Sequence, residues 1–512
     1  MYPGTHARTT PDKPAVVMAA TGASLTYAEL DDESVRIAQV LREAGLERGD
    51  TVALVMANDV HYLSVCWAAQ RAGLRYVPVN WHLTGDEIRY VVDDSEARSL
   101  VVGPGCGPST VATLATCPSL RSRFELGAPE TGLDPLATAM AAAPGGALDD
   151  EWEGADMIYS SGTTGLPKGG RRGLPGRLPA DFPRAALEFY DRFGFGSDSV
   201  YLTPGAPLYH AAPLRFSMVV HRYGGTNVVL DAFDPLAALE AIEAHGVTHS
   251  QWVPTMFVRL LRLPPDQRSR HDLSTHQVAI HSAAPCPVET KQAMIDWWGP
   301  IVHEYYGASE GGILTHATAQ EWLAHPGSVG RAVVGRIHVV DDDGAEVGVG
   351  ATGTIYGEAG RPVDYLNDAE KTRRAHTAEG WATVGDVGHV DDDGFLYLTD
   401  RRDHMIISGG VNIYPQEAEN VLLQHPAVAD VAVIGVPNAD LGEEARAVVE
   451  LVDPTAAGDE VAAELVRWCG DRLARFKVPR GIDFVAELPR APSGKLYKRR
   501  LRDAYWPAGD AR

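Results

Sequence analysis

Cysteine is scarce in this chain of 512 residues: there are five, and no two of them form a Cys-x-x-Cys pair. Their odd number and wide scatter exclude a disulfide framework and a cysteine-based metal site, and favour a reducing compartment. The sequence also lacks an apolar run of membrane-spanning length and a basic-then-apolar N-terminal segment. We therefore expect a cytoplasmic protein without integral membrane contact.

Basic residues are outnumbered as well, with 45 Lys and Arg against 68 Asp and Glu and a formal net charge of −23. Nucleic-acid binding requires a basic face, so the charge balance argues against a nucleic-acid partner and against an anionic membrane surface. A chain of this length exceeds what one hydrophobic core supports, and two or more domains are expected.

Apolar runs of strand length alternate with helical patterns over the first ~400 residues, which indicates α/β layering. The stretch 103–154 is richer in Ala, Gly and Pro and is expected to be a looser excursion. After residue 335, short alternating segments between Asp/Gly turns predict a small β-rich subdomain. Strands are expected at 51–57, 76–79, 100–103 and 226–230, and helices at 61–72 and 84–95, the latter with a Thr cap.

A new pattern starts after residues 400–404. Helices are expected at 415–424 and 459–473, and strands at 428–436 and 445–451. The remaining ~110 residues suffice for a compact domain of their own. We therefore predict a C-terminal domain over residues 403–512, following a larger domain over residues 1–402.

Residues 159–170, YSSGTTGLPKGG, carry the most informative motif of the chain. Glycines let backbone N–H groups close around an anion, the hydroxyls add donors, and Lys168 supplies a positive charge. Lys168 precedes two glycines, whereas a Walker A loop needs Gly-Lys-Ser/Thr entering a helix. The segment is predicted to cradle phosphates at the end of a strand. A flexible surface turn is the alternative.

Four further segments follow in order: YYGASE at 305–310, GWATVGD at 380–386, DRRDHMIISGGVNI at 400–413 and PRAPSGK at 489–495. With the phosphate loop, they resemble the adenylate-forming superfamily, which includes acyl-CoA synthetases such as fatty-acid–CoA ligases, firefly luciferases and nonribosomal adenylation domains. The resemblance covers nearly the whole chain. It implies an α/β fold with a large N-terminal domain of layered sheets plus a small β subdomain, and a small mobile α+β C-terminal domain.

The resemblance also implies a nucleotide site. Tyr306 and Gly307 would border the adenine, and Ser309 would contact the α-phosphate of ATP. Glu310 would ligate Mg²⁺, a hard cation that prefers carboxylate oxygen. Asp386 and Arg401 would hold the ribose. The residues implied to hold the β- and γ-phosphates are Ser160, Ser161, Gly162, Thr163, Thr164, Gly165 and Lys168.

By the same resemblance, Lys495 would be the catalytic lysine between the substrate carboxylate and the α-phosphate. Rotation of the C-terminal domain about a hinge at Asp403 would then bring a CoA-binding face to the site. That face comprises Ser408, Gly409 and Gly410. The acyl pocket would draw on His210, Trp252, Ser282, Ala283 and Gly311, with His210 near the carboxylate.

The predicted pocket segment 208–214 contains no carboxylate, so an α-amino acid is not expected as substrate. Its apolar lining favours an aliphatic, alicyclic or aromatic acid. For Arg215, His221 and Arg222, which follow, a charged helix face is the favoured interpretation and contact with a second polar group of the acid is the alternative. A basic, Pro-rich insert at 171–183 is expected to face the nucleotide phosphates or CoA.

The resulting hypothesis is an acyl-CoA synthetase that uses ATP, Mg²⁺, CoA and a small carboxylic acid. The alternative is a stand-alone adenylating enzyme that delivers its acyl group to a carrier-protein thiol, an amine or another acceptor. A non-catalytic nucleotide-binding relative would be expected to lack Lys495 or Glu310, and both are present. Taken singly, Glu310, Asp386, Arg401 and Lys495 also fit ordinary surface or turn positions. The oligomeric state, a homodimer included, is left open.

Overall fold

A computed structural model describes residues 1–127, 132–160, 167–307, 312–358, 364–365, 373, 375–409, 411–490 and 496–506. The chain forms two compact units. Unit 1 comprises Met1–Trp252, Arg259–Ile280 and Pro362–Arg374, and unit 2 comprises Val253–Val258, His281–Arg361 and Ala375–Arg512. The domain boundary between residues 402 and 403 stays a prediction.

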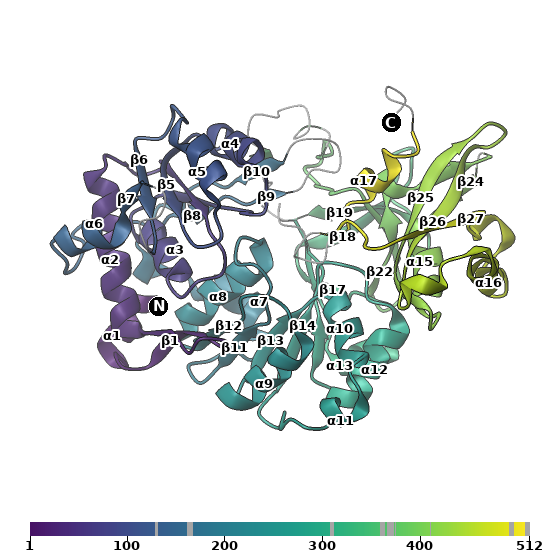
Figure 1. Cartoon of the computed structure of the whole chain (residues 1–512), viewed down its shortest axis with the longest axis horizontal. Coiled ribbons are helices and arrows are strands. Elements are labelled where there is room, and N and C mark those ends of the chain that lie inside the picture. Colours follow the sequence, from purple (N-terminus) through teal and green to yellow (C-terminus); the bar gives the residue numbers. More distant parts are fainter. Residues whose placement is uncertain are drawn as a thin grey trace. The chain divides into compact units, whose positions relative to one another are not determined.

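A six-stranded sheet of parallel strands, in the order β7-β6-β5-β3-β4-β8, forms the first layer of unit 1 (Figure 1). The expected strands and helices before residue 103 are confirmed, including the Thr84 cap of α4. The elements are β3 (Thr51–Val55), β4 (Arg75–Val79), β5 (Ala97–Val102), β6 (Ser122–Glu125), β7 (Asp134–Pro135), β8 (Ala155–Asp156), α2 (Tyr27–Glu43), α3 (Tyr62–Arg71), α4 (Gly85–Asp94), α5 (Pro108–Ala115) and α6 (Leu136–Ala142).

The expectation of a looser excursion at 103–154 was wrong. Strand β6 pairs with β5 in parallel and extends the sheet, and α5 precedes it. Val111 and Leu114 of α5 are buried against the sheet. Small residues and prolines dominate the composition of this stretch, but two apolar side chains one helical turn apart suffice to dock a short helix.

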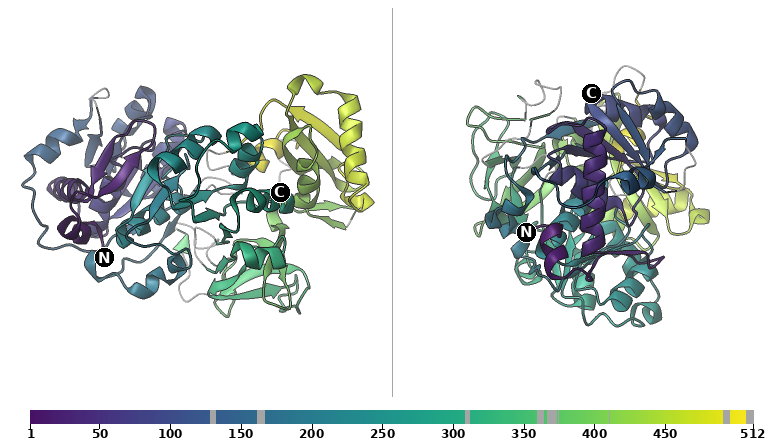
Figure 2. Two further views of the ribbon diagram at one scale, coloured as in Figure 1. Left: turned by 90° about the horizontal axis from the view of Figure 1, so that it is seen from below. Right: turned by 90° about the vertical axis from the view of Figure 1, so that its left-hand side faces the viewer.

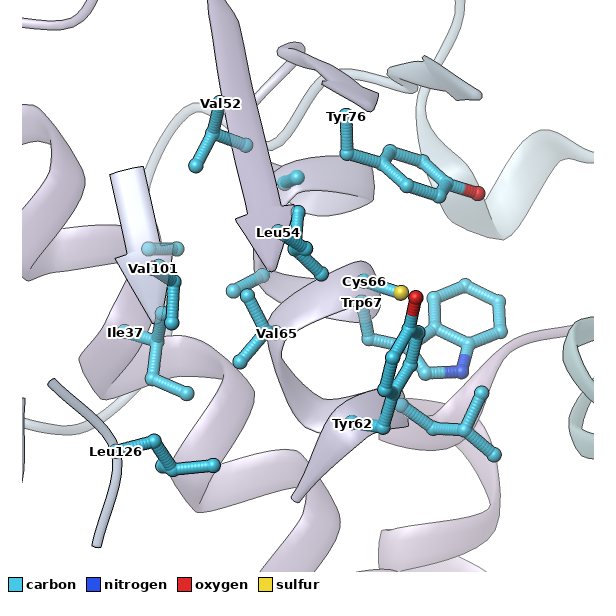
Figure 3. Close-up of a cluster of buried hydrophobic side chains, with 14 of the residues drawn as sticks. Ile37, Val52, Leu54, Tyr62, Val65, Cys66, Trp67, Tyr76, Val101 and Leu126 are labelled. Atoms are coloured by element: carbon cyan, nitrogen blue, oxygen red, sulfur yellow. The ribbon is translucent and has the colours of Figure 1, made fainter. Parts of the chain in front are cut away.

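Strand β3 is buried on both faces, as expected for a central strand of a parallel sheet. Val52 and Leu54 extend into a cluster with Val65 and Trp67 of α3 (Figure 3). Ala53 and Val55, with the opposite orientation, pack with residues of α4 and α5. Helices therefore cover both faces of the sheet.

Six strands of a second, seven-stranded sheet follow the order β14-β13-β11-β12-β1-β2, with β13, β11, β12 and β1 parallel and β2 antiparallel at the edge. These strands are β1 (Pro14–Met18), β2 (Ser24–Thr26), β11 (Val200–Thr203), β12 (Thr226–Val229), β13 (His249–Trp252) and β14 (Val278–His281). Its helices are α1 (Pro3–Thr9), α7 (Glu188–Asp191), α8 (Ala211–Tyr223), α9 (Pro235–His245) and α11 (Pro265–Arg268), while α10 (Pro254–Leu261) extends across the boundary between the units.

A buried histidine joins the two layers of unit 1. The Nδ1 atom of His221 on α8 accepts a hydrogen bond of 3.0 Å from the indole of Trp67 on α3. Its Nε2 atom lies 3.0 Å from the carbonyl oxygen of Ala15 on β1, to which it donates. Burial lowers the pKa of His221 to about 4, so the ring is neutral at physiological pH.

This histidine should make the fold sensitive to acid. Its folded-state pKa lies below the ordinary value of 6.5, so between these values the unfolded chain binds a proton that the folded chain does not. The stabilisation is complete above pH ~6.5 and decreases as the pH falls, by about 2 kcal/mol at pH 5. We expect His221→Gln to lower the free energy of unfolding at pH 7.5, as measured by urea unfolding. The decrease in this free energy between pH 7.5 and pH 5 should be about 2 kcal/mol smaller in the variant than in the wild type. An unchanged pH dependence would contradict the assignment.

Unit 2 contains the expected β-rich subdomain, a four-stranded antiparallel sheet in the order β18-β19-β21-β22. Its strands are β18 (Arg336–Val340), β19 (Gly353–Glu358), β21 (Asp386–Val390) and β22 (Leu396–Arg401). The neighbouring elements of unit 2 are β15 (Val302–Glu304), β16 (Leu314–His316), β17 (Arg331–Val334), α12 (Val288–Trp298) and α13 (Ala319–Ala324).

The last ~100 residues build a five-stranded sheet of their own, with β27 beside β26 (Figure 2). Its two faces are covered separately, by α15 and α16 on one side and by α17 on the other. The elements are β23 (Ile406–Ser408), β24 (Val411–Ile413), α15 (Pro415–Leu423), β25 (Val428–Asn438), β26 (Gly442–Leu451), α16 (Asp459–Gly470), β27 (Gly481–Val485) and α17 (Lys498–Arg502). Among the described residues, no helix has the length and apolar character needed to cross a membrane.

Candidate functional site

The predicted phosphate loop joins the two strands of a hairpin. Strand β9 (Tyr159–Ser160) pairs antiparallel with β10 (Lys168–Arg171), and Ser160 lies directly opposite Lys168. The two ends of the loop are therefore held together, with the Lys168 backbone on a strand rather than in a helix, unlike a Walker A lysine. Residues 161–166, which include Ser161, Gly162, Thr163, Thr164 and Gly165, lie outside the described residues.

A tyrosine fixes this hairpin to the first sheet. The hydroxyl of Tyr159 donates a 2.7 Å hydrogen bond to Asp94 at the end of α4. The ring of Tyr159 lies against β10, where a Cβ atom on Gly169 would come within 2.8 Å of it. Gly169 is thus required for close packing, which explains a glycine directly after Lys168.

Three predicted nucleotide-site residues come together in unit 2, from segments far apart in the sequence. Asp386 begins β21 and lies opposite Arg401 at the end of β22. The hydroxyl of Tyr306 donates a 2.6 Å hydrogen bond to one oxygen of the Asp386 carboxylate. The Nε atom of Arg401 lies 3.1 Å from the other oxygen. Asp386 is 6% exposed, so this carboxylate is both buried and satisfied.

A buried ion pair, which the sequence analysis did not identify, supports the segment that carries Tyr306. The Nζ atom of Lys291 on α12 lies 2.6 Å from the carboxylate of Glu304, two residues before Tyr306. Both side chains are almost completely buried, and Lys291 also lies over the ring of Trp322. In the sequence, the only indication of this buried pair was a lysine within a partly apolar helix. Its partner is identifiable only in the fold.

The predicted hinge lies next to a well-anchored aspartate. Asp403 is in a short 3-10 helix, Arg402–His404, directly after β22. The carboxylate of Asp400 accepts a hydrogen bond of 2.9 Å from the backbone N–H of Gln416 in the first turn of α15. Ser408 ends β23, and Gly409 has a positive φ of 57° in the turn before β24, while Gly410 is outside the described residues.

Three predicted catalytic residues and one predicted pocket residue also lie outside the described part of the chain. These are Ser309, Glu310, Gly311 and Lys495. The ends of the segment that carries Lys495 are nevertheless placed. Arg490 and Leu496 form an antiparallel bridge, and Arg490 binds the carboxylate of Asp430 on β25 with one contact of 2.7 Å.

One predicted pocket residue of unit 1 lies at the carboxyl end of a parallel strand, the edge at which ligands bind in open α/β sheets. Trp252 ends β13 and is 1% exposed, with its indole donating to the Ser250 hydroxyl at 2.6 Å. His210 precedes α8 in the segment that follows β11. In unit 2, Ser282 and Ala283 follow β14, and Ala283 has a φ of 78°, which strains a non-glycine residue.

The interpretation of residues 215–222 as a charged helix face was wrong for His221 and Arg222. Arg222 is 4% exposed and donates a 2.7 Å hydrogen bond to Glu153, which is 1% exposed. Arg177 of the basic insert binds the other oxygen of Glu153. The guanidinium of Arg222 also lies over the ring of Phe182. These charges therefore serve to fix part of the insert to unit 1.

Two protein-family models match the chain. The family model described as "AMP-binding enzyme" matches residues 4–358. The model described as "AMP-binding enzyme C-terminal domain" matches residues 417–495.

Individual relatives match the chain over almost its full length. It is 35% identical to a feruloyl-CoA synthase from Amycolatopsis sp, with 98% of each chain covered. It is 32% identical to the fatty acid–[acyl-carrier-protein] ligase ScoC from Streptomyces coeruleorubidus, covering 98% of this chain and 95% of the relative. Among solved structures, ATP-bound MatB from Rhodopseudomonas palustris matches with a TM-score of 0.81 and 30% identity, with 99% of each chain covered.

Proposed function

The chain belongs to the AMP-binding enzyme family, and we propose that it converts a carboxylic acid to an acyl-adenylate and then transfers the acyl group to coenzyme A. The observation that carries the proposal is the Tyr306–Asp386–Arg401 arrangement. A buried carboxylate with a tyrosine and an arginine on its two oxygens provides a fixed polar edge for a nucleotide. Asp386 would accept from the ribose hydroxyls, with Tyr306 beside the adenine.

The first half-reaction joins two anions, so positioning and charge neutralisation supply most of the rate. One oxygen of the substrate carboxylate attacks the α-phosphorus of ATP, and pyrophosphate leaves with the bonding electrons. We assign Lys168 and the backbone of the phosphate loop to the leaving pyrophosphate, and Lys495 to the charge that develops at the α-phosphate. Glu310 would hold Mg²⁺, which would supply positive charge to neutralise the phosphates. The described cluster of Tyr306, Asp386 and Arg401 fits the nucleoside end of ATP.

The second half-reaction transfers the acyl group to a thiol. We propose that the domain beginning at Asp403 rotates and presents the turn at Ser408, Gly409 and Gly410 to the adenylate. Hinges are a few residues at the ends of elements that absorb large backbone changes, and Asp403 has such a position directly after β22. The relative ScoC is named for an acyl-carrier-protein acceptor. A carrier-protein thiol or an amine is therefore the alternative acceptor.

The test is pyrophosphate release across a panel of carboxylic acids, with Mg²⁺-ATP, each run with and without CoA. We expect release that depends on the acid and turnover that rises when CoA is added, because CoA removes the bound acyl-adenylate. Release without a response to CoA would direct the search to carrier proteins or amines. Failure of every acid to give pyrophosphate would contradict adenylation itself.

A further inference from the structure

A buried lysine, three residues after Lys495, joins two helices of the C-terminal sheet. The Nζ atom of Lys498, the first residue of α17, lies 2.6 Å from the Oε1 atom of Glu419 on α15. Their side chains are only 10% and 6% exposed. The same Glu419 oxygen accepts a 2.6 Å hydrogen bond from the backbone N–H of Val433 on β25. The pair therefore fixes the start of α17 to both α15 and β25.

The chain on both sides of residues 491–495 is also attached to β25, which stands last in the strand order β24-β23-β26-β25. Before this segment, Arg490 binds the carboxylate of Asp430 on β25, with one contact of 2.7 Å. After it, Leu496 packs against an apolar cluster that includes Ala432 of the same strand. An ion pair and an apolar contact thus hold the two ends of the segment, beside the anchor at the start of α17.

Lys498 also interacts with a carboxylate on the other side of the proposed hinge. Asp400 lies on β22, before the hinge, and its side chain is almost completely buried. It accepts a 2.9 Å hydrogen bond from the backbone N–H of Gln416, one helical turn before Glu419 on α15. Burial opposes the charge of Asp400, yet hydrogen bonding to His404 and the positive charge of Lys498 lower the pKa of this carboxyl. The Lys498 ammonium therefore interacts with one carboxylate on each side of the hinge.

Strand β22 connects this cluster to the proposed ribose site. Arg401 follows Asp400 in the strand, and its Nε atom lies 3.1 Å from the Asp386 carboxylate. A chain spans at most ~3.6 Å per residue, so the Cα atoms of Lys495 and Lys498 are within about 11 Å of each other. The contacts of Asp400 therefore bring the segment of Lys495 to the end of β22 that carries Arg401.

We propose that Lys498 is a positioning residue for adenylation, which holds Lys495 at the α-phosphate while the C-terminal domain is seated against β22. The inference rests on the proposed adenylating function and adds a residue to its first half-reaction. Rotation about the hinge separates Lys498 from Asp400. It leaves the pair with Glu419 intact, because both partners follow the hinge in the chain. Lys498 is therefore required for the first half-reaction and not for the second.

The main experiment is ATP–pyrophosphate exchange in a variant that combines Lys498→Met with Glu419→Gln. This variant leaves no unpaired charge at the buried site, and the glutamine amide oxygen still accepts from the Val433 N–H. We expect kcat for exchange to fall roughly 10- to 100-fold, the effect of moving a catalytic group by about 1 Å. The KM for ATP, and thioester formation from a supplied acyl-adenylate, should change by less than about threefold.

The matched control combines Lys477→Met with Glu417→Gln. This pair also joins α15 to a lysine of the C-terminal domain, but its side chains are more exposed, at 26% and 33%. Neither residue contacts the segment 496–498 or Asp400 through any hydrogen bond or ion pair found among the described residues. Exchange in the control should therefore stay within about threefold of the wild-type rate.

A double-mutant cycle tests whether Lys498 acts through Lys495. In the Lys495→Ala background, Lys498→Met should change the residual exchange by less than about twofold, because the residue that it positions is already gone. A loss as large as that in the wild-type background would show an independent role for Lys498 and would overturn the inference.

Other results would also overturn it. Exchange at the wild-type rate in the variant of the Lys498–Glu419 pair would show that the pair positions nothing. Equal loss of both half-reactions, or an equal loss in the control, would make the pair structural. A higher KM for ATP at constant kcat would mean that Lys498 binds the nucleotide itself. Absence of exchange with every acid in the wild-type enzyme would contradict the proposed function instead.

Discussion

Lys495→Ala is expected to lose adenylation and to retain thioester formation from a supplied acyl-adenylate. In the first half-reaction, negative charge accumulates at the α-phosphate while a second anion attacks it, and a lysine ammonium between them lowers the barrier. Removing one such electrostatic contact typically costs about 10²- to 10³-fold in kcat. In the second half-reaction the mixed anhydride is already formed, and rotation about Asp403 would move Lys495 away from the reacting atoms.

The measurement is ATP–pyrophosphate exchange for the first half-reaction, and thioester formation from a synthetic acyl-adenylate and CoA for the second. Lys477→Ala is the matched control, because Lys477 belongs to the same C-terminal part and pairs with Glu417 on α15. Exchange at the wild-type rate in Lys495→Ala would exclude a catalytic role for this residue. Equal loss of both half-reactions would instead indicate damage to the domain.

Local signals in the sequence predicted most of the elements correctly. Thr84 shows why: its hydroxyl and the Glu87 side chain three residues later cap each other's backbone, so the start of α4 is encoded within four residues. Strand β3 is apolar throughout because both of its faces are covered. The short strand β6 was missed, since a segment of four residues with three polar side chains has too little periodicity to identify.

Pairings between distant residues could not be predicted in the same way. Tyr306, Asp386 and Arg401 were each identified from a motif, and the fold places the Tyr306 hydroxyl and the Arg401 guanidinium on the Asp386 carboxylate. By contrast, Arg222 and Glu153 are 69 residues apart, and neither lies in a recognisable motif. A buried charge needs a partner, yet the sequence does not show which charges become buried. The supporting pair Lys291–Glu304 was missed for the same reason.

Asp386→Asn is expected to raise the KM for ATP roughly 10- to 100-fold, the range for the loss of a charged hydrogen bond. The substitution keeps the shape of the side chain and removes its charge. An asparagine can accept from Tyr306 or Arg401 with its single amide oxygen, and its NH₂ group then faces a second donor. The ribose would lose its anionic acceptor at the same time. Initial rates of pyrophosphate release against ATP concentration measure the effect.

A matched aspartate in the same hairpin separates nucleotide binding from stability. Asp391 follows β21 and also accepts from a tyrosine and lies next to a basic side chain, with Tyr397 at 3.1 Å and His325 at 3.0 Å. Asp391→Asn should therefore disturb the same sheet without changing the KM for ATP. If both variants raised this KM equally, the effect of Asp386 would be structural. If only Asp386→Asn raised it, the ribose assignment would hold, because the two sites differ in their predicted contact with the nucleotide rather than in their chemistry.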